Sequence, residues 1–97
     1  MGDDFTFNKT VVPMKLAKYG MDELVSRSQA KRLLARVDLF KIVIFDFQDV
    51  ASIGQAFADQ IFRVFAKDHP DIELVPVHVQ PAVKEMIERA RALGRAG

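Results

Sequence analysis

Three aspartates near the middle of the sequence offer the side chains best suited to chemistry. Asp46 ends an apolar run, Asp49 follows three positions later, and Asp59 comes ten positions after that. Carboxylate oxygens are the ligands that Mg²⁺ prefers, so these residues could form a metal site. A structural role is the alternative, because an aspartate at the end of a strand accepts hydrogen bonds from backbone N–H groups of the following turn. We favour the structural role and predict no metal site.

Other catalytic groups are scarce. His69 stands beside a helix-stopping proline and His78 lies in a strand-like stretch, each far in sequence from a recognisable partner, so we expect structural or surface roles for both. The chain has no cysteine, which excludes thiol chemistry and a cysteine-based zinc site. No base, nucleophile or metal-ligand set stands out. We therefore predict a protein that is not an enzyme and needs no cofactor.

A helix start near Gly54 could bind an anion. Gln55 follows Gly54 directly, so the glycine-rich runs of the P-loop and of the dinucleotide fingerprint are missing. A helix N-terminus still offers unpaired N–H groups and a positive dipole end, where a phosphate or carboxylate could dock with help from Arg27 or Lys31. Ser52 is the nearest hydroxyl, and it could instead cap the helix.

The elements that position these residues centre on Lys41–Phe65. Lys41–Phe47 is a nearly unbroken apolar run, typical of a central strand that is covered on both faces. After a short polar stretch, apolar residues recur at the spacing of one helical face, and this helix should end near Lys67 because Pro70 disfavours continuation. Phe62 could complete the core or stay partly exposed as a contact for another protein.

Helices and strands are also predicted on both sides of this unit. Phe5, Phe7 and Lys9 alternate with polar residues as in a strand, and Val11–Lys18 could form a second, edge strand that contains Pro13. A helix capped by Ser26 or Ser28 follows. Its apolar stripe consists of Ala30, Leu33, Leu34 and Val37.

The C-terminal third should add a strand and a helix. Ile72–Val79 alternates and contains Pro76, which suits an edge, and Pro81 occupies the favoured first position of the last helix. The predicted buried stripe of that helix is Val83, Met86, Ile87, Ala90 and Leu93. The resulting order is ββαβαβα in one domain, residues 1–97, with a mixed α/β sheet. The N-terminal strands would pair antiparallel, and the helices would pack mainly on one face.

Bulk properties restrict the classes of function. The 97 residues carry a formal charge of +1, far from the basic balance of a dedicated nucleic-acid binder. Arg27, Lys31, Arg32 and Arg36 would form a basic helix face, which we interpret as a solvated face, with an anionic partner as the alternative. The N-terminus contains no long apolar run, so we expect a cytoplasmic protein without a membrane partner.

Three motifs resemble a known family. They are Ser26-Arg27-Ser28-Gln29-Ala30, Phe45-Asp46-Phe47 and the stretch Ile53–Asp59, reading IGQAFAD. The stretch from Leu24 to Val77 that holds them resembles the STAS-like domains of unknown function of bacteria and archaea. Those look related to STAS domains proper, the module of anti-sigma-factor antagonists.

The resemblance implies a regulatory module, active in signalling through protein–protein interaction. Its implied partner is a histidine-kinase-like ATPase or a transcription regulator. STAS domains carry a phosphorylatable serine near the start of the helix after the central strand, but this chain has no hydroxyl from Gly54 to Phe57. Phosphoserine switching is therefore not expected, and Ser52 is not the equivalent residue.

We predict partner binding along the start of the central helix. The predicted contact residues are Ser52, Ile53, Gly54, Gln55, Ala56, Asp59, Phe62 and Arg63. A sensor of a nucleotide or an anionic metabolite is the alternative function, with Arg27 and Lys31 as the anion-binding residues.

Overall fold

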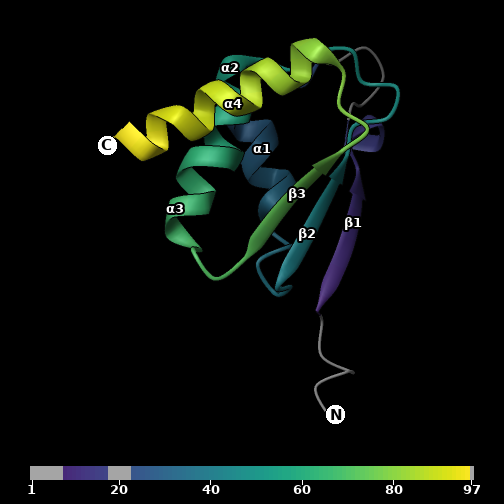
Figure 1. Cartoon of the computed structure of the whole chain (residues 1–97). Helices are drawn as coiled ribbons and strands as arrows, with labels where there is room; N and C mark the ends of the chain where they lie inside the picture. The colour runs from purple at the N-terminus through teal and green to yellow at the C-terminus, as the bar shows by residue number, and fades with distance from the viewer. Residues whose placement is uncertain (1–7, 18–22, 97) are drawn as a thin grey trace.

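The computed structural model describes residues 8–17 and 23–96, in which three strands form one parallel sheet. Strand β1 spans Lys9–Pro13, β2 spans Ile42–Asp46 and β3 spans Glu73–Val77, with β2 in the centre (Figure 1). The prediction of an antiparallel N-terminal pair is wrong for β1, which runs parallel to β2. Phe5 and Phe7 lie outside the described residues.

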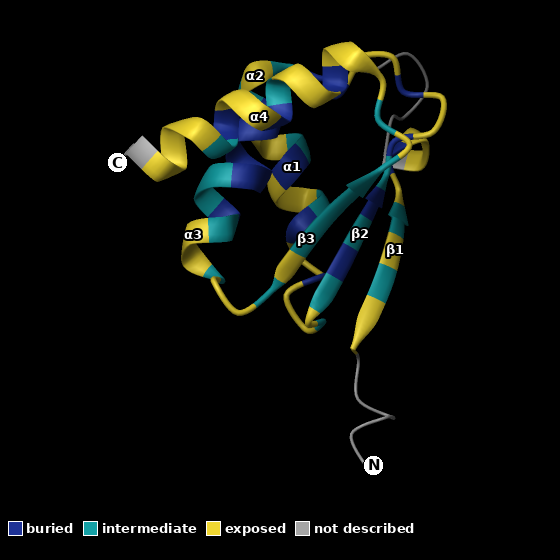
Figure 2. Cartoon of the chain, in the orientation of Figure 1, coloured by how far each residue is buried: buried dark blue, intermediate teal, exposed yellow. Residues whose placement is uncertain are grey.

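Helices cover one face of this sheet (Figure 1). Val43 and Phe45 of β2 are fully buried in the core, whereas Ile42 and Ile44, which alternate with them and so face the other side, are only half-buried. Figure 2 shows this alternation of buried and partly buried positions along β2. Val11 lies opposite Ile44 in the register and is 54% exposed. The prediction that helices lie mainly on one face is confirmed. The expectation that the central strand is covered on both faces is wrong for the described residues.

The first helices follow from local signals. After β1, Met14–Ala17 forms the short 3₁₀ helix η2, whose Met14 is fully buried. Helix α1 spans Arg27–Leu34 and begins with a capping box: the Ser26 hydroxyl accepts a hydrogen bond from Gln29 N, and Gln29 Oε1 accepts one from Ser26 N. Ser26 is thus the N-cap, one of the two caps that the sequence offered.

The central helix is continuous from Gln55 to Asp68 but changes its winding. It consists of α2 (Gln55–Asp59), the π-helical segment η3 (Gln60–Phe65) and α3 (Ala66–Asp68). Its N-cap is Gly54, and no side chain caps it, so the prediction that Ser52 does so is wrong. Helix α4, Pro81–Ala96, starts at Pro81 as predicted.

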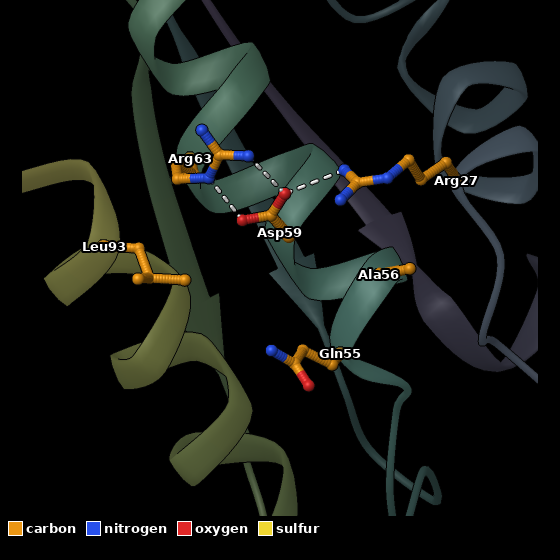
Figure 3. A pocket seen from close by; sticks show the side chains of 6 residues that line it. All are labelled: Arg27, Gln55, Ala56, Asp59, Arg63 and Leu93. Carbon is orange, nitrogen blue, oxygen red and sulfur yellow. Dashed lines mark hydrogen bonds and ion pairs between the residues drawn. The ribbon is translucent and has the colours of Figure 1, made fainter. Parts of the chain in front are cut away.

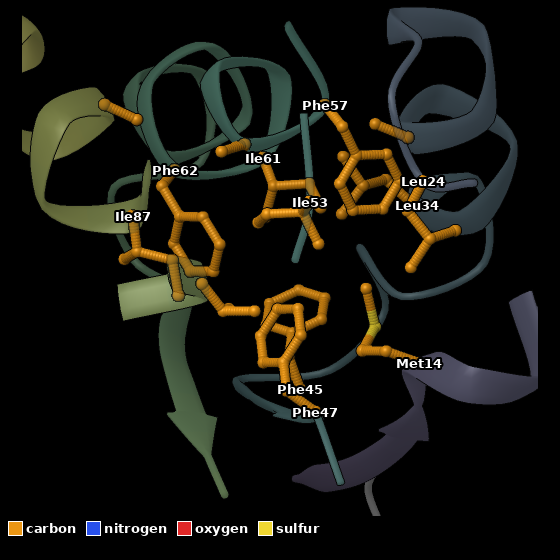
Figure 4. Packing of buried hydrophobic residues seen from close by; sticks show 14 of the residues in the cluster. Met14, Leu24, Leu34, Phe45, Phe47, Ile53, Phe57, Ile61, Phe62 and Ile87 are labelled. Carbon is orange, nitrogen blue, oxygen red and sulfur yellow. The ribbon is translucent and has the colours of Figure 1, made fainter. Parts of the chain in front are cut away.

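The core lies between the sheet and the helices (Figure 4). Phe45 and Phe47 from the strand side meet Phe57 and Ile61 from the central helix, and all four are fully buried. Phe62 is 3% exposed and packs edge-to-face on Phe45 with ring centroids 5.6 Å apart, so it completes the core.

Helix α4 departs from its predicted buried stripe at two positions, Met86, which is only partly buried, and Leu93. Val83, Ile87 and Ala90 are buried as expected, but Leu93 is 52% exposed. Within residues 8–17 and 23–96, no helix is long and apolar enough to cross a membrane.

Candidate functional site

A groove of about 400 Å³ separates the start of the central helix from the end of α4 (Figure 3). Four residues of the central helix line it, Gln55, Ala56, Asp59 and Arg63. Leu93 of α4 and Arg27 of α1 complete the lining. Four predicted partner-binding residues and one predicted anion-binding residue therefore meet at one place. The exposed Leu93 adds an apolar wall.

Asp59 forms ion pairs with both arginines that line the groove, Arg27 and Arg63. Its side chain is 7% exposed and accepts two hydrogen bonds from Arg63. Arg63 Nε donates to Oδ1, and Arg63 Nη2 donates to Oδ2 at 2.7 Å. Arg27 Nη1 donates to the same carboxylate at 2.8 Å. Hydrogen bonds from Arg63, and then from Arg27, lower the pKa of Asp59 below its ordinary value although burial opposes the shift. Asp59 thus joins α1 to the central helix as a buried carboxylate.

Two backbone features bring α1 to this position. The capping box at Ser26 fixes the start of α1, so Arg27 becomes its first residue. Gly54 N donates a hydrogen bond to Leu24 O at 2.8 Å, which places Gly54 directly against Val25. A Cβ atom on Gly54 would lie 2.8 Å from Val25 Cα, so this close approach requires glycine.

The remaining predicted contact residues do not line this groove. Ser52 is exposed, whereas Ile53 and Phe62 are 6% and 3% exposed. Lys31 is exposed on α1 but does not line the groove, and Arg27 is already bound to Asp59. The two residues predicted to bind an anion are therefore not brought together in this groove.

Of the other two aspartates, Asp46 has the predicted structural role at the end of its strand. Asp46 Oδ1 accepts a hydrogen bond from Gln48 N at 3.0 Å and lies 2.9 Å from His78 Nδ1, and these two contacts lower the pKa of Asp46. Asp49 pairs instead with Lys15 at 3.3 Å. In the described part of the chain, no three acidic or histidine side chains gather as a metal site would require.

The histidines also have visible contacts. His69 lies against the Phe65 ring with centroids 4.3 Å apart, and His78 is an exposed partner of Asp46. His78 and Asp49 both have positive φ, 55° and 66°, in the loops that leave β3 and β2. No local sequence pattern predicts these backbone conformations, which non-glycine residues adopt uncommonly.

A second groove was missed by the sequence analysis. It has a volume of about 550 Å³ and adjoins the first at Arg63, and its other cationic residues are Lys67, Arg91 and Arg95. A signal exists in the sequence, because Arg63 and Lys67, like Arg91 and Arg95, are four residues apart and so share a helix face.

Acid should weaken the fold through Asp59. Because its folded pKa is below the unfolded value of about 3.8, the folded state binds fewer protons. The resulting stabilisation is complete above that value and is lost as the pH falls through the folded pKa, and solvent screening of the half-exposed arginines limits its size. We expect Asp59→Asn to reduce the loss of unfolding free energy between pH 5 and pH 3, measured by urea titration.

The matched control is Asp68→Asn, an exposed aspartate that forms no ion pair with the described residues. It should keep the wild-type dependence of stability on pH. An Asp59→Asn variant with an unchanged dependence would show that the carboxylate clamp contributes nothing to acid sensitivity.

The fold and the groove define a small α/β domain with helices on one face of a parallel sheet. A family model described as a STAS-like domain of unknown function (DUF4325) matches residues 29–84, more than half of the chain. The chain belongs to this family, as its resemblance predicted. No curated protein and no solved structure gives a significant match.

Proposed function

We propose that this chain is a non-enzymatic regulatory module that binds a partner protein across the first groove. The observation that carries the proposal is the 52% exposure of Leu93 beside Gln55 and Arg63, on the rim of a groove between two helices. An exposed leucine next to polar side chains that can hydrogen-bond resembles the mixture found at protein interfaces. The proposed contact surface consists of Gln55, Ala56, Arg63 and Leu93.

The buried residues of the predicted set support this surface from below. Asp59 fixes the Arg63 side chain through two hydrogen bonds, so Arg63 is held in place before a partner arrives. Ile53 and Phe62 anchor the same segment in the core. A surface held in its binding conformation loses less side-chain entropy on association.

The proposed partner is a histidine-kinase-like ATPase domain or a transcription regulator. Membership in a STAS-like family supports this choice, since STAS domains proper serve anti-sigma-factor antagonists. Gly54, Gln55 and Ala56 occupy the helix start and carry no hydroxyl, so the proposed docking does not depend on a phosphoserine there.

Filling the groove tests the proposal. A photo-crosslinking residue at position 55, introduced in the native cells, identifies the partner, whose affinity is then measured by titration with purified proteins. Ala56→Arg should weaken binding at least tenfold, about 1.4 kcal/mol, because the long side chain occupies the groove without touching the core. Circular dichroism and thermal unfolding establish that the variant is folded.

The control is Ala82→Arg, which adds the same side chain at an exposed position of α4 outside the groove. It should bind the partner as the wild type does. Equal affinity of the wild type and a folded Ala56→Arg variant would refute the groove as the docking surface.

A further inference from the structure

We propose that the second groove is a separate binding site for an acidic peptide segment of a partner protein. Four cationic residues line it in two rows: Arg63 and Lys67 on the central helix, Arg91 and Arg95 on α4. In the part of the chain that the structure describes, no acidic residue lines the groove. The inference goes beyond the proposed docking surface, because Lys67, Arg91 and Arg95 have no part in that surface.

The positive charge of this groove is largely unneutralised. Arg63 forms an ion pair with Asp59. Lys67, Arg91 and Arg95 form no ion pair within residues 8–17 and 23–96. Arg91 donates to a neutral acceptor, Leu74 O, at 3.0 Å, and its charge remains. Three uncompensated cations around one groove create a positive potential that attracts carboxylates.

One cation is held rigidly, as a binding site requires. The Arg91 guanidinium lies 5.2 Å from the centre of the Phe62 ring, and its hydrogen bond to β3 fixes it further. Arg91 is only partly exposed, whereas Lys67 on the central helix and Arg95 on α4 are exposed. Arg91 is thus held in position before a ligand binds, and the exposed side chains of Lys67 and Arg95 are free to move toward the ligand.

The spacing fits a peptide. The Cβ atoms of residues four apart on a helix are about 6 Å apart, which is close to the distance between alternate side chains of an extended chain. Between the rows, Ala66 and Gly94 expose only small groups, which leave room for a main chain or an apolar side chain. Guanidinium groups also match the planar geometry of carboxylates.

The groove favours a peptide over a nucleic acid. Single-stranded nucleic acids bind through aromatic side chains on which their bases stack. Phe62 is the aromatic residue that lines this groove, and it is 3% exposed beneath Arg91, so it offers no free face. Without a stacking surface, the small apolar floor and the carboxylate-binding cations suit acidic side chains better.

Fluorescence anisotropy with a fluorescein-labelled peptide, Glu-Leu-Glu-Glu-Leu-Glu, tests the site. At low ionic strength we expect the peptide to bind, and its analogue with glutamine in place of glutamate to bind at least tenfold more weakly. The double variant Lys67→Glu with Arg95→Glu should lose at least tenfold in affinity. Arg91 is left unchanged because it contacts Phe62 and β3.

The control is Arg36→Glu with Lys41→Glu, which reverses one arginine and one lysine at exposed positions outside the groove. It should retain wild-type affinity, and an equal loss in both double variants would mean non-specific charge attraction and overturn the proposal. Absence of peptide binding would also overturn it. So would tighter binding of a labelled single-stranded oligonucleotide that depends on Lys67 and Arg95.

Ala56→Arg separates this site from the docking surface, because it fills the first groove alone. We expect this variant to bind the acidic peptide normally. If it lost the peptide as completely as the Lys67 and Arg95 double variant did, the two grooves would form one site, and the proposal of a separate site would fail.

Discussion

Phe45→Ala is expected to reduce the free energy of unfolding by about 3–5 kcal/mol. Phe45 is fully buried in the central strand and packs edge-to-face on Phe62, so its removal leaves a cavity between the sheet and the central helix. Domains are typically stable by about 5–15 kcal/mol, so the variant should be close to unfolding at 37 °C. Urea titration at 25 °C measures the difference.

Phe45→Leu provides the comparison, because it keeps most of the buried volume and loses only the aromatic contact. We expect a cost of about 1–2 kcal/mol for this change. A loss below about 1 kcal/mol in Phe45→Ala would contradict the burial of this ring.

Gly54→Ala is expected to destabilise the protein by about 1–3 kcal/mol, the usual cost of overpacking. The new Cβ atom would lie 2.8 Å from Val25 Cα, and backbone cannot rotate away as the end of a side chain can. The segment before α1 must therefore shift, which disturbs the hydrogen bond from Gly54 N to Leu24 O. Thermal and urea unfolding should both detect the change.

The same substitution at Gly94 should have the opposite sign. Gly94 lies within α4, where alanine is favoured over glycine by about 0.5–1 kcal/mol. Its Cβ atom would lie 3.5 Å from Arg63 Cγ, an ordinary contact. If Gly54→Ala were as stable as the wild type, the close approach of Gly54 to Val25 would be disproved.

The strand and helix at the centre of the chain were predictable because their signals are local. The apolar run before Asp46 and the helical spacing after Gly54 each arise from residues that are close in sequence. Pro81 likewise marked the start of α4. The direction of β1 was not predictable, because alternation shows that a stretch is a strand but does not tell which strand it joins.

The grouping of four candidate residues was predictable from the sequence, but their burial and contacts were not. Gln55, Ala56, Asp59 and Arg63 were found from the helix start, and the structure places all four around one groove. The burial of Asp59 was missed, because it depends on Arg27, which is 32 positions earlier in the chain. Leu93 was predicted to lie in the core because it continues the apolar stripe of α4. The spacing of apolar residues does not show how far the other helices cover that stripe.

The prolines of the two outer strands bear on self-association. Val77 O accepts a hydrogen bond from Phe47 N, directly after β2, so the backbone groups of the preceding residue, Pro76, point away from β2. Asn8 O accepts a hydrogen bond from Ile42 N of β2. Pro13 is five residues later, an odd number, so its backbone groups also point away from β2. Proline has no N–H group to donate at these outward positions. A strand from another molecule that aligned with either edge would lack one hydrogen bond of its ladder. Among residues 8–17 and 23–96, the sheet therefore carries protection against edge-to-edge aggregation at both outer strands, which matters because no described helix covers its second face.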